Sequence, residues 1–321
     1  MLAAARQHLQ VGWPEVPFGA GTNTDFIFAK RTPPPLEQID AICIALNPQV
    51  HAFDNRSLLE TCEGQQMVVE SARRLAGGRP VVVSPLTLKP RFNPHILGPQ
   101  PQPDPGSLPA QVDPRQRSLF GAVWTLASLR ALVLAGAESV TLFETTGWRG
   151  VLEREAGSPW PPPHPALPGV VYPLYHVLAD LGEFAGGQAA AWGAPDSPLL
   201  GLALRKEGRL AWLIANPSET EQMLSWPEAR GPVRLRRLDE SNAELAMRQP
   251  EQYRAHPGEL FATSRFPPPS GGNAWHAVLS PAPDEKTELE RGSTPDRGSY
   301  TLRLPPYGLV RLDFENRRNE A

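Results

Sequence analysis

The sequence predicts an α/β fold in two parts, and three observations support this prediction. Four apolar segments within residues 1–187 each end in polar residues. Helical or proline-rich stretches follow the first three of them, which is typical of parallel strands joined by crossovers. After Gly186-Gly187 the apolar spacing changes from the helical period to alternation. We therefore expect the C-terminal half of a (β/α)8 TIM-like barrel in residues 1–187, followed by an antiparallel β-sandwich domain in residues 188–321.

The polar ends of the barrel strands indicate where function resides. The strands are predicted at residues 16–21, 41–46, 80–84 and 139–143. The C-terminal ends of parallel barrel strands meet at one face, and β/α barrels carry their active sites there. We therefore expect the functional residues directly after these four strands.

Helix signals lie between the predicted strands. Ser57-Leu58-Leu59-Glu60 is a capping box that begins a helix, and Gly77-Gly78 ends this helix after Ala76. Further helices or helical turns are predicted at 1–10, 36–40, 118–135 and 173–184. Residues 85–116 form a long proline-rich loop, and loops of this length in compact domains are usually functional covers.

The second part reads as short strands separated by turns. They are predicted at residues 200–204, 210–215, 233–238, 274–279, 300–304 and 308–314. A polar and partly helical insertion is predicted at residues 239–259. Alternating apolar residues in strands of this number are typical of an antiparallel β-sandwich.

The first part supplies too few strands to close a barrel. A closed β/α barrel needs eight strands, whereas residues 1–187 supply four. Because the last helix leads directly into the β-domain, these strands are interpreted as strands five to eight, and the first half is expected to be missing through truncation or a split barrel. A complete, open four-stranded domain is the alternative. Open strand edges also predict self-association.

Composition narrows the possible partners. The formal net charge is −3 with no long charged run, which argues against nucleic acid and membrane surfaces as partners. The longest apolar stretch, 126–137, is interrupted by Ser128 and Arg130, and the N-terminus has no secretory pattern. Cys43 and Cys62 do not make a disulfide framework. We expect a cytoplasmic protein that acts on a small molecule.

Common catalytic and cofactor motifs are absent. The sequence contains no G-x-S-x-G, H-E-x-x-H, C-x-x-C or P-loop pattern. Gly19-Ala20-Gly21-Thr22-Asn23-Thr24 lacks the third glycine of a dinucleotide fingerprint. His51, Asp54 and Glu144 are a weak metal-ligand pattern. No cofactor and no metal is therefore expected.

Glu144 is the sharpest candidate for catalysis. It follows an apolar strand within Phe143-Glu144-Thr145-Thr146-Gly147-Trp148-Arg149. A carboxylate at a strand exit can act as general base or nucleophile. The alternative is a structural ion pair. Trp148 offers a flat surface for a sugar ring, or packs the rim, and Arg149 is a candidate substrate-binding residue.

The end of the second strand supplies another cluster. Asn47, Gln49 and His51 alternate, so they share one face if the strand continues. Histidine is the side-chain type best suited to proton transfer near neutral pH, and Asp54 is placed to orient His51. A loop histidine bound to backbone carbonyls is the alternative for His51.

The first and third strands end in further polar residues. Asn23 and Asp25 follow the first strand, and Lys89 and Arg91 follow the third. Cations at this rim would hold a developing oxyanion or a carboxylate. A solvated loop is the alternative, and it is the favoured interpretation for His95.

Four segments that contain these polar residues resemble a known family. They are Gly21-Thr22 with Asp25-Phe26, Asn47 to Asp54, Ser84 to Pro94, and Phe143 to Gly150, and all resemble the D-apionate lactonases. The resemblance implies hydrolysis of D-apionolactone to D-apionate in branched-pentose catabolism. It also implies a barrel similar to those of glycoside hydrolases, followed by a β-domain that Leu304 to Leu312 would close. It implies no mechanism for individual residues.

Three hypotheses follow. The first is a sugar-lactone hydrolase with Glu144 or His51 as general base, Arg91 or Lys89 stabilising negative charge, and Asn47 and Gln49 binding hydroxyl groups. The second is a barrel glycoside hydrolase, which needs a second carboxylate. The third is a non-catalytic, truncated remnant or a sugar-binding module.

Overall fold

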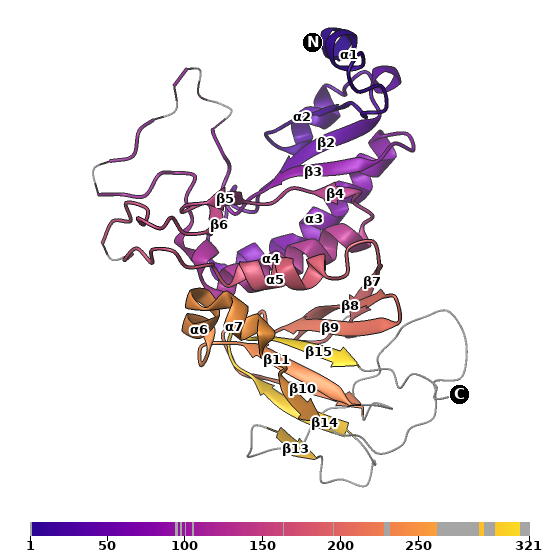
Figure 1. The fold of residues 1–321 in the computed structure, drawn as a ribbon. Coiled ribbons are helices and arrows are strands. Elements are labelled where there is room, and N and C mark those ends of the chain that lie inside the picture. The colour runs from indigo at the N-terminus through magenta and orange to yellow at the C-terminus, as the bar shows by residue number, and fades with distance from the viewer. Residues whose placement is uncertain are drawn as a thin grey trace. The chain divides into compact units, whose positions relative to one another are not determined.

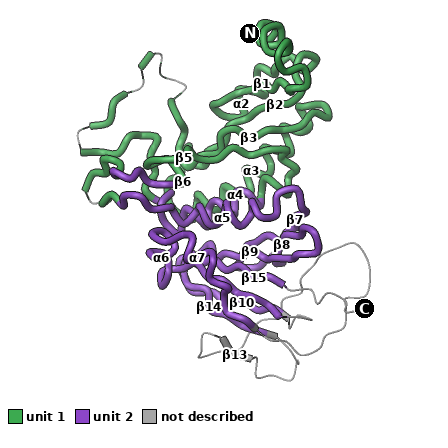
Figure 2. The backbone as a smooth tube through the Cα atoms, viewed as in Figure 1, with its two compact units in different colours: residues 1–114, 131–151, 157–166 green, residues 115–130, 152–156, 167–321 purple. Residues whose placement is uncertain are grey.

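The chain forms two compact units, which Figure 2 distinguishes by colour. The computed structural model describes residues 2–93, 96, 98–99, 101–104, 106–162, 164–194, 196–227, 232–261, 289–291 and 299–314. Unit 1 comprises residues 1–114, 131–151 and 157–166, and unit 2 comprises residues 115–130, 152–156 and 167–321. The segments interleave, so the division of the chain at residue 187 remains a prediction.

A four-stranded parallel sheet is the centre of unit 1 (Figure 1). Its strands are β1 (Gly19–Gly21), β2 (Ala41–Leu46), β3 (Val81–Leu86) and β4 (Ser139–Val140), in the order β1-β2-β3-β4. All three neighbouring pairs are parallel. The four predicted barrel strands are thus confirmed, although β1 and β4 are shorter than predicted.

Alternating burial explains why these segments form strands. Ile42 and Ile44 of β2, and Val81 and Val83 of β3, are buried on one face of the sheet. Gly21 is required by a close approach, because a Cβ atom there would lie 1.7 Å from the carbonyl oxygen of Cys43. A side chain at this position would force β1 away from β2.

Four helical segments of unit 1 precede or connect the first three strands. They are α1 (Leu2–Leu9), α2 (Phe26–Arg31), the 3-10 turn η1 (Leu36–Gln38) and α3 (Asn55–Leu75). The prediction of a capping box at Ser57 is wrong. Asp54 is the N-cap of α3, and its Oδ1 accepts a hydrogen bond from the backbone N–H of Ser57 at 2.9 Å. The helix therefore begins earlier than predicted.

The remaining elements before residue 187 match the predicted helices and add a hairpin. The helical segments are η2 (Pro114–Arg117), α4 (Leu119–Leu134) and α5 (Leu174–Gly182), which confirm the helices predicted at 118–135 and 173–184. The sequence did not reveal the short two-stranded sheet of β5 (Glu144–Thr146) and β6 (Gly150–Leu152). No helix among the described residues is long and apolar enough to cross a membrane.

Unit 2 contains two antiparallel sheets, as the alternating sequence predicts. One has the order β12-β11-β15-β9-β8-β7 and the other the order β10-β14-β13. Their strands are β7 (Gln188–Trp192), β8 (Leu200–Lys206), β9 (Arg209–Ala215), β10 (Gln222–Pro227), β11 (Val233–Leu238), β12 (Glu259–Phe261), β13 (Leu289–Arg291), β14 (Ser299–Leu304) and β15 (Leu309–Phe314). The helices α6 (Ala243–Arg248) and α7 (Pro250–Ala255) form the predicted insertion. The predicted strand at 274–279 lies outside the described residues.

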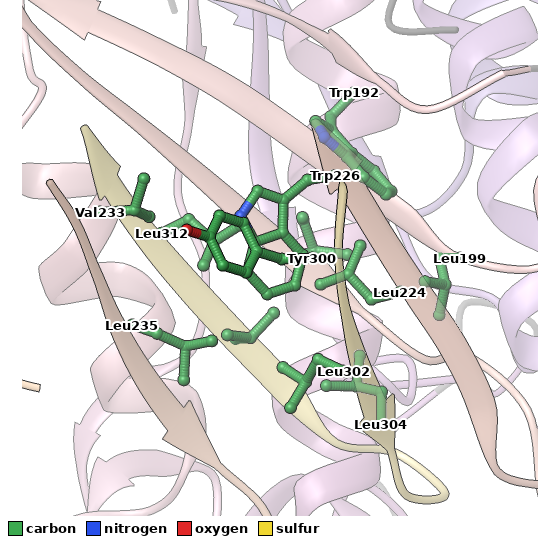
Figure 3. Close-up of a cluster of buried hydrophobic side chains, with 12 residues drawn as sticks. Trp192, Leu199, Leu224, Trp226, Val233, Leu235, Tyr300, Leu302, Leu304 and Leu312 are labelled. Atoms are coloured by element: carbon green, nitrogen blue, oxygen red, sulfur yellow. The ribbon is translucent and has the colours of Figure 1, made fainter. Parts of the chain in front are cut away.

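Buried side chains of both sheets form one hydrophobic cluster (Figure 3). Trp226 of β10 stacks on Tyr300 of β14, with 5.7 Å between ring centroids. Leu235 and Leu312, from β11 and β15, belong to the same cluster. A shared core of this kind is what the predicted β-sandwich requires.

An ionic cluster supports the same unit. Asp180 of α5 forms ion pairs with Arg254 at 2.9 Å and with Arg311 at 2.8 Å. Glu183 binds the same two arginines, at 2.6 and 2.8 Å. Burial alone would raise the pKa of Glu183, but its hydrogen bonds and the charges of these arginines outweigh burial and lower the pKa to about 2.

Candidate functional site

A hollow of ≈ 460 Å³ lies in unit 1 where β1, β2 and β3 end. Its lining comes from the segment after β1, the end of β2 and the long segment after β3. The polar residues of the lining are Asn23, Thr24, Asp25, Asn47, Gln49, Thr87, Arg91, Asn93 and Gln111. The structure thus brings five of the predicted site residues together, namely Asn23, Asp25, Asn47, Gln49 and Arg91.

The end of β2 contributes two amides with different environments. Gln49 is 5% exposed, and its Nε2 donates to the carbonyl oxygen of Leu88 at 2.7 Å and to Oδ2 of Asp113 at 2.6 Å. Asn47 has a buried Oδ1 atom without a hydrogen-bond partner among the described residues. A buried acceptor of this kind is costly unless water or a ligand binds it.

The segment after β1 supplies the carboxylate of the hollow. Asp25 is the N-cap of α2, and its Oδ1 accepts from the backbone N–H of Ile27 at 2.9 Å. This bond fixes the side chain at the rim. Among the described lining residues, Asp25 is the one carboxylate. Asn23 is exposed beside it.

The segment after β3 supplies the cation. Arg91 is exposed on the lining and makes no hydrogen bond or ion pair with the part of the chain that the structure describes. Lys89 does not line the hollow, and its carbonyl oxygen accepts from Oγ1 of Thr87 at 2.7 Å. His95 lies outside the described residues. Arg91 is therefore the cation available to a ligand in this hollow.

The segment after β4 is arranged separately from this hollow. Glu144 begins the β5–β6 hairpin and forms an ion pair with Arg149 at 2.6 Å. The indole of Trp148 meets that of Trp160 edge to face, at 6.0 Å between centroids. None of Glu144, Trp148 and Arg149 lines the hollow. The expectation that Glu144 ends an apolar strand is wrong, because β4 stops at Val140 and Glu144 opens the next strand.

His51 stands apart from the other polar residues of its segment. It is exposed and does not line the hollow. The proposed orienting role of Asp54 is not realised, because its carboxylate caps α3 through Ser57. This hydrogen bond holds the pKa of Asp54 below its usual value.

The sequence pattern does not predict two buried acidic residues. Asp113 is 2% exposed and accepts the Gln49 amide. In unit 2, Glu153 is 3% exposed, and its Oε2 accepts from the hydroxyl of Tyr172 at 3.0 Å. Burial raises the pKa of Tyr172 above its usual value. Both acids lie in irregular segments with no periodic pattern, so nothing in the sequence marks them as buried.

Metal-ligating side chains do not gather in the described part of the chain. No group of three or more His, Cys, Asp or Glu residues there is arranged to hold a metal ion. Cys43 and Cys62 form no disulfide bond, and burial raises the pKa of the Cys43 thiol. Asp25, Arg91 and Asn47 are the candidate functional groups on the described lining of the hollow.

Comparison with known proteins links these residues to a family. The sequence model described as "D-apionate lactonase, TIM barrel domain" matches residues 1–186. A D-apionate lactonase from Brucella anthropi is 30% identical over 185 residues, which are 57% of this chain and 29% of that protein. The match thus spans less than a third of the length of that relative.

Solved structures support the same architecture. A family 51 α-L-arabinofuranosidase from Bifidobacterium longum has a TM-score of 0.51 at 12% identity, over 96% of this chain and 61% of that chain. An arabinose-bound α-L-arabinofuranosidase has a TM-score of 0.52 at 12% identity, over 96% of this chain and 41% of that chain. At this identity the likeness shows the fold alone. The family match, which covers more than half of the chain, and the barrel-type parallel sheet agree, and the chain belongs to the D-apionate lactonase family through its TIM barrel domain.

Proposed function

We propose that this protein hydrolyses a sugar lactone, and that the substrate is D-apionolactone with D-apionate as product. The observation that carries the proposal is the hollow at the ends of β1 to β3. There a carboxylate, an unpaired guanidinium and an unpartnered amide oxygen line one space in the described part of the chain. The relative from Brucella anthropi, a D-apionate lactonase, supports the choice of substrate.

Lactone opening requires three functions from such a site. Water adds to the carbonyl carbon, the bond from this carbon to the ring oxygen breaks, and the ring oxygen takes a proton. A base assists the attack, and a positive charge stabilises the oxyanion of the tetrahedral intermediate. The product is a hydroxy acid, which releases one proton at neutral pH.

The lining residues can be assigned to these functions. Asp25 is the base that accepts a proton from the attacking water, because it is the described carboxylate of the hollow. Arg91 holds the developing oxyanion and then the product carboxylate. Asn47 accepts a hydrogen bond from a substrate hydroxyl through its unpartnered Oδ1.

Glu144 and His51 remain predicted bases from the sequence. Neither lines the hollow, and Glu144 is held by Arg149. A role for either requires the substrate to extend beyond the hollow as it stands. Lys89, Trp148 and Arg149 remain predicted substrate-binding residues on the same condition.

The test compares variants of residues that line the hollow with a variant of a predicted base that does not line it. Acid release from D-apionolactone and from other pentonolactones is followed above the uncatalysed rate. We expect Asp25→Asn and Arg91→Ala to lower kcat/KM by about 100-fold or more, and His51→Gln to leave it within about threefold. Full activity in Asp25→Asn and Arg91→Ala would remove the hollow from the reaction.

The alternative is a glycoside hydrolase. This chemistry needs two carboxyl groups about 5–5.5 Å or 6.5–9.5 Å apart. The described lining of the hollow supplies Asp25 alone. Release of nitrophenol from nitrophenyl α-L-arabinofuranoside without lactone hydrolysis would favour this alternative over the lactonase.

We also propose that the protein self-associates through unit 1. Among the described strands, β1 and β4 each pair on one side only. Exposed apolar side chains gather on the segments around β1, and Val11 and Trp13 are 87% and 62% exposed. Light scattering after size exclusion tests this. A dimer that Trp13→Glu weakens is expected, and a monomer at all concentrations would contradict the proposal.

A further inference from the structure

Gln49 joins two of the segments that build the hollow. It follows β2, it contacts Leu88 of the segment after β3, and it contacts Asp113 at the end of that segment. Leu88 and Asp113 are 1% and 2% exposed, so the contacts are shielded from water. The residues between them, 89–112, include Arg91. One side chain thus holds both ends of the segment that carries the cation.

Both side-chain N–H groups of Gln49 are used in these two contacts. A glutamine amide nitrogen has two N–H donors, and Gln49 uses both, one to a carbonyl oxygen and one to a carboxylate oxygen. A bond to a charged, buried acceptor is stronger than one between neutral groups. The Gln49 nitrogen is therefore occupied within the protein, whereas the Asn47 oxygen beside it has no partner among the described residues.

We propose that Gln49 is a positioning residue that, together with Asp113, holds the segment that carries Arg91 on the lining of the hollow that Asn47 shares. The proposal rests on the proposed function of the hollow and changes the role that the sequence suggested for Gln49. The amide does not bind substrate hydroxyls through its nitrogen. It holds together the walls from which Asn47 and Arg91 act.

The length of the segment explains why an anchor by Gln49 would matter. Residues 89–112 carry no helix or strand among their described members. A long irregular segment has many accessible conformations, and anchoring both ends on one side chain removes much of this freedom. Misplacement of a catalytic contact by about 1 Å lowers the rate by about 100-fold. The anchor is therefore expected to affect the rate without contacting the reacting atoms.

Matched substitutions test the anchor. Gln49→Met keeps the size of the side chain and removes both donors, and Asp113→Leu keeps the shape and removes the acceptor. We expect each to lower kcat/KM for D-apionolactone by about 100-fold. Asp113→Asn retains an acceptor oxygen and is expected to stay within about fivefold of the unmodified protein. Gln66→Met is the control, because Gln66 makes the same kind of bond to Glu70 on α3 at 2.9 Å, away from the hollow.

Hydrogen exchange separates this proposal from the proposed function. In Gln49→Met, the amides of residues 87–93 and 106–113 should exchange faster, while those of α3 remain unchanged. Faster exchange with no lactonase activity in the unmodified protein would overturn the proposed function and leave the anchor. Unchanged exchange would overturn the anchor. Where the unmodified protein is active, equal activity of Asp113→Leu and Asp113→Asn would overturn it as well.

Discussion

Unit 1 and unit 2 arrange their charged and apolar side chains differently. Among the described residues of unit 1, the Asn47 amide oxygen and the Arg91 guanidinium line a hollow without a partner, and apolar groups are exposed near β1. Unit 2 pairs its charges in a buried cluster and packs its aromatic rings into one core. Ligand binding needs unsatisfied groups, whereas stability needs satisfied ones. Substitutions in unit 1 are therefore expected to affect activity more than stability, and substitutions in the core of unit 2 to affect stability more.

The largest effect is expected from the core of unit 2. Trp226 is 1% exposed and stacks on Tyr300, so Trp226→Ala removes buried apolar surface and leaves a cavity. We expect a loss of about 3–5 kcal/mol in the free energy of unfolding. Trp13→Ala in unit 1 removes an exposed ring and should change the free energy of unfolding of the monomer by less than about 0.5 kcal/mol. Denaturant titration of both variants measures the two losses in free energy of unfolding. Equal losses would contradict the expectation that the core of unit 2 stabilises the protein more than the exposed ring in unit 1.

The second effect is a loss of stability in acid that arises in unit 2. Burial lowers the pKa of His176 to about 4, although its Nε2 contacts the carbonyl oxygen of Ala246 at 3.0 Å. Between pH 6.5 and pH 4 the unfolded chain therefore binds a proton that the folded chain does not. Stability falls through this window by up to about 3 kcal/mol. Below the usual pKa of a glutamate, Glu183 adds to the loss, because its pKa is lowered to about 2.

His176→Gln isolates this contribution. Glutamine keeps a polar group near Ala246 and does not titrate, so the free energy of unfolding should change less between pH 7 and pH 5 than in the unmodified protein. His8→Gln on α1 replaces an exposed histidine and should leave the pH dependence as it was. The same slope in all three proteins would show that His176 is not the titrating group.

The sequence predicted the fold well because its pattern is regular where the fold is regular. Strands β2, β3, β8 and β9 have the apolar runs or alternation that burial demands, and they lie where expected. The sequence does not predict strands β5, β6, β7, β10, β12 and β13. Their segments are short, alanine-rich or polar, and pairing with neighbours rather than local preference makes them strands.

The candidate site was predicted only in part because side-chain partners are not local in sequence. Position after a strand correctly suggested Asn47, Arg91 and Asp25 as neighbours. It gave no hint that Gln49 would bind Asp113, which lies 64 residues away. Nor did it show that Glu144 would face Arg149 across a hairpin, because β4 ends earlier than its apolar sequence suggests.

A smaller effect on stability is expected at the N-terminus of α3 in unit 1. Asp54 caps α3 and Ser57 does not, although the sequence suggested Ser57. Asp54→Ala should therefore destabilise the protein by about 1 kcal/mol, and Ser57→Ala by less. Thermal unfolding of the two variants measures this. A larger loss of stability in Ser57→Ala than in Asp54→Ala would show that Ser57 is the N-cap, as the predicted capping box requires.

A small effect on stability is also expected for Glu144, and this residue separates two interpretations of the rim. The Glu144–Arg149 ion pair is partly exposed, with the carboxylate side chain 40% accessible, so Glu144→Gln should cost less than about 1 kcal/mol. Any loss of lactonase activity in this variant would then report a role in the reaction rather than unfolding. Because Glu144 does not line the hollow, we expect kcat/KM to fall by less than about tenfold, well short of the effect of Asp25→Asn. If Glu144→Gln loses more activity than Asp25→Asn while its unfolding curve is unchanged, the base lies on the β5–β6 hairpin, and the hollow binds the sugar rather than activating the water.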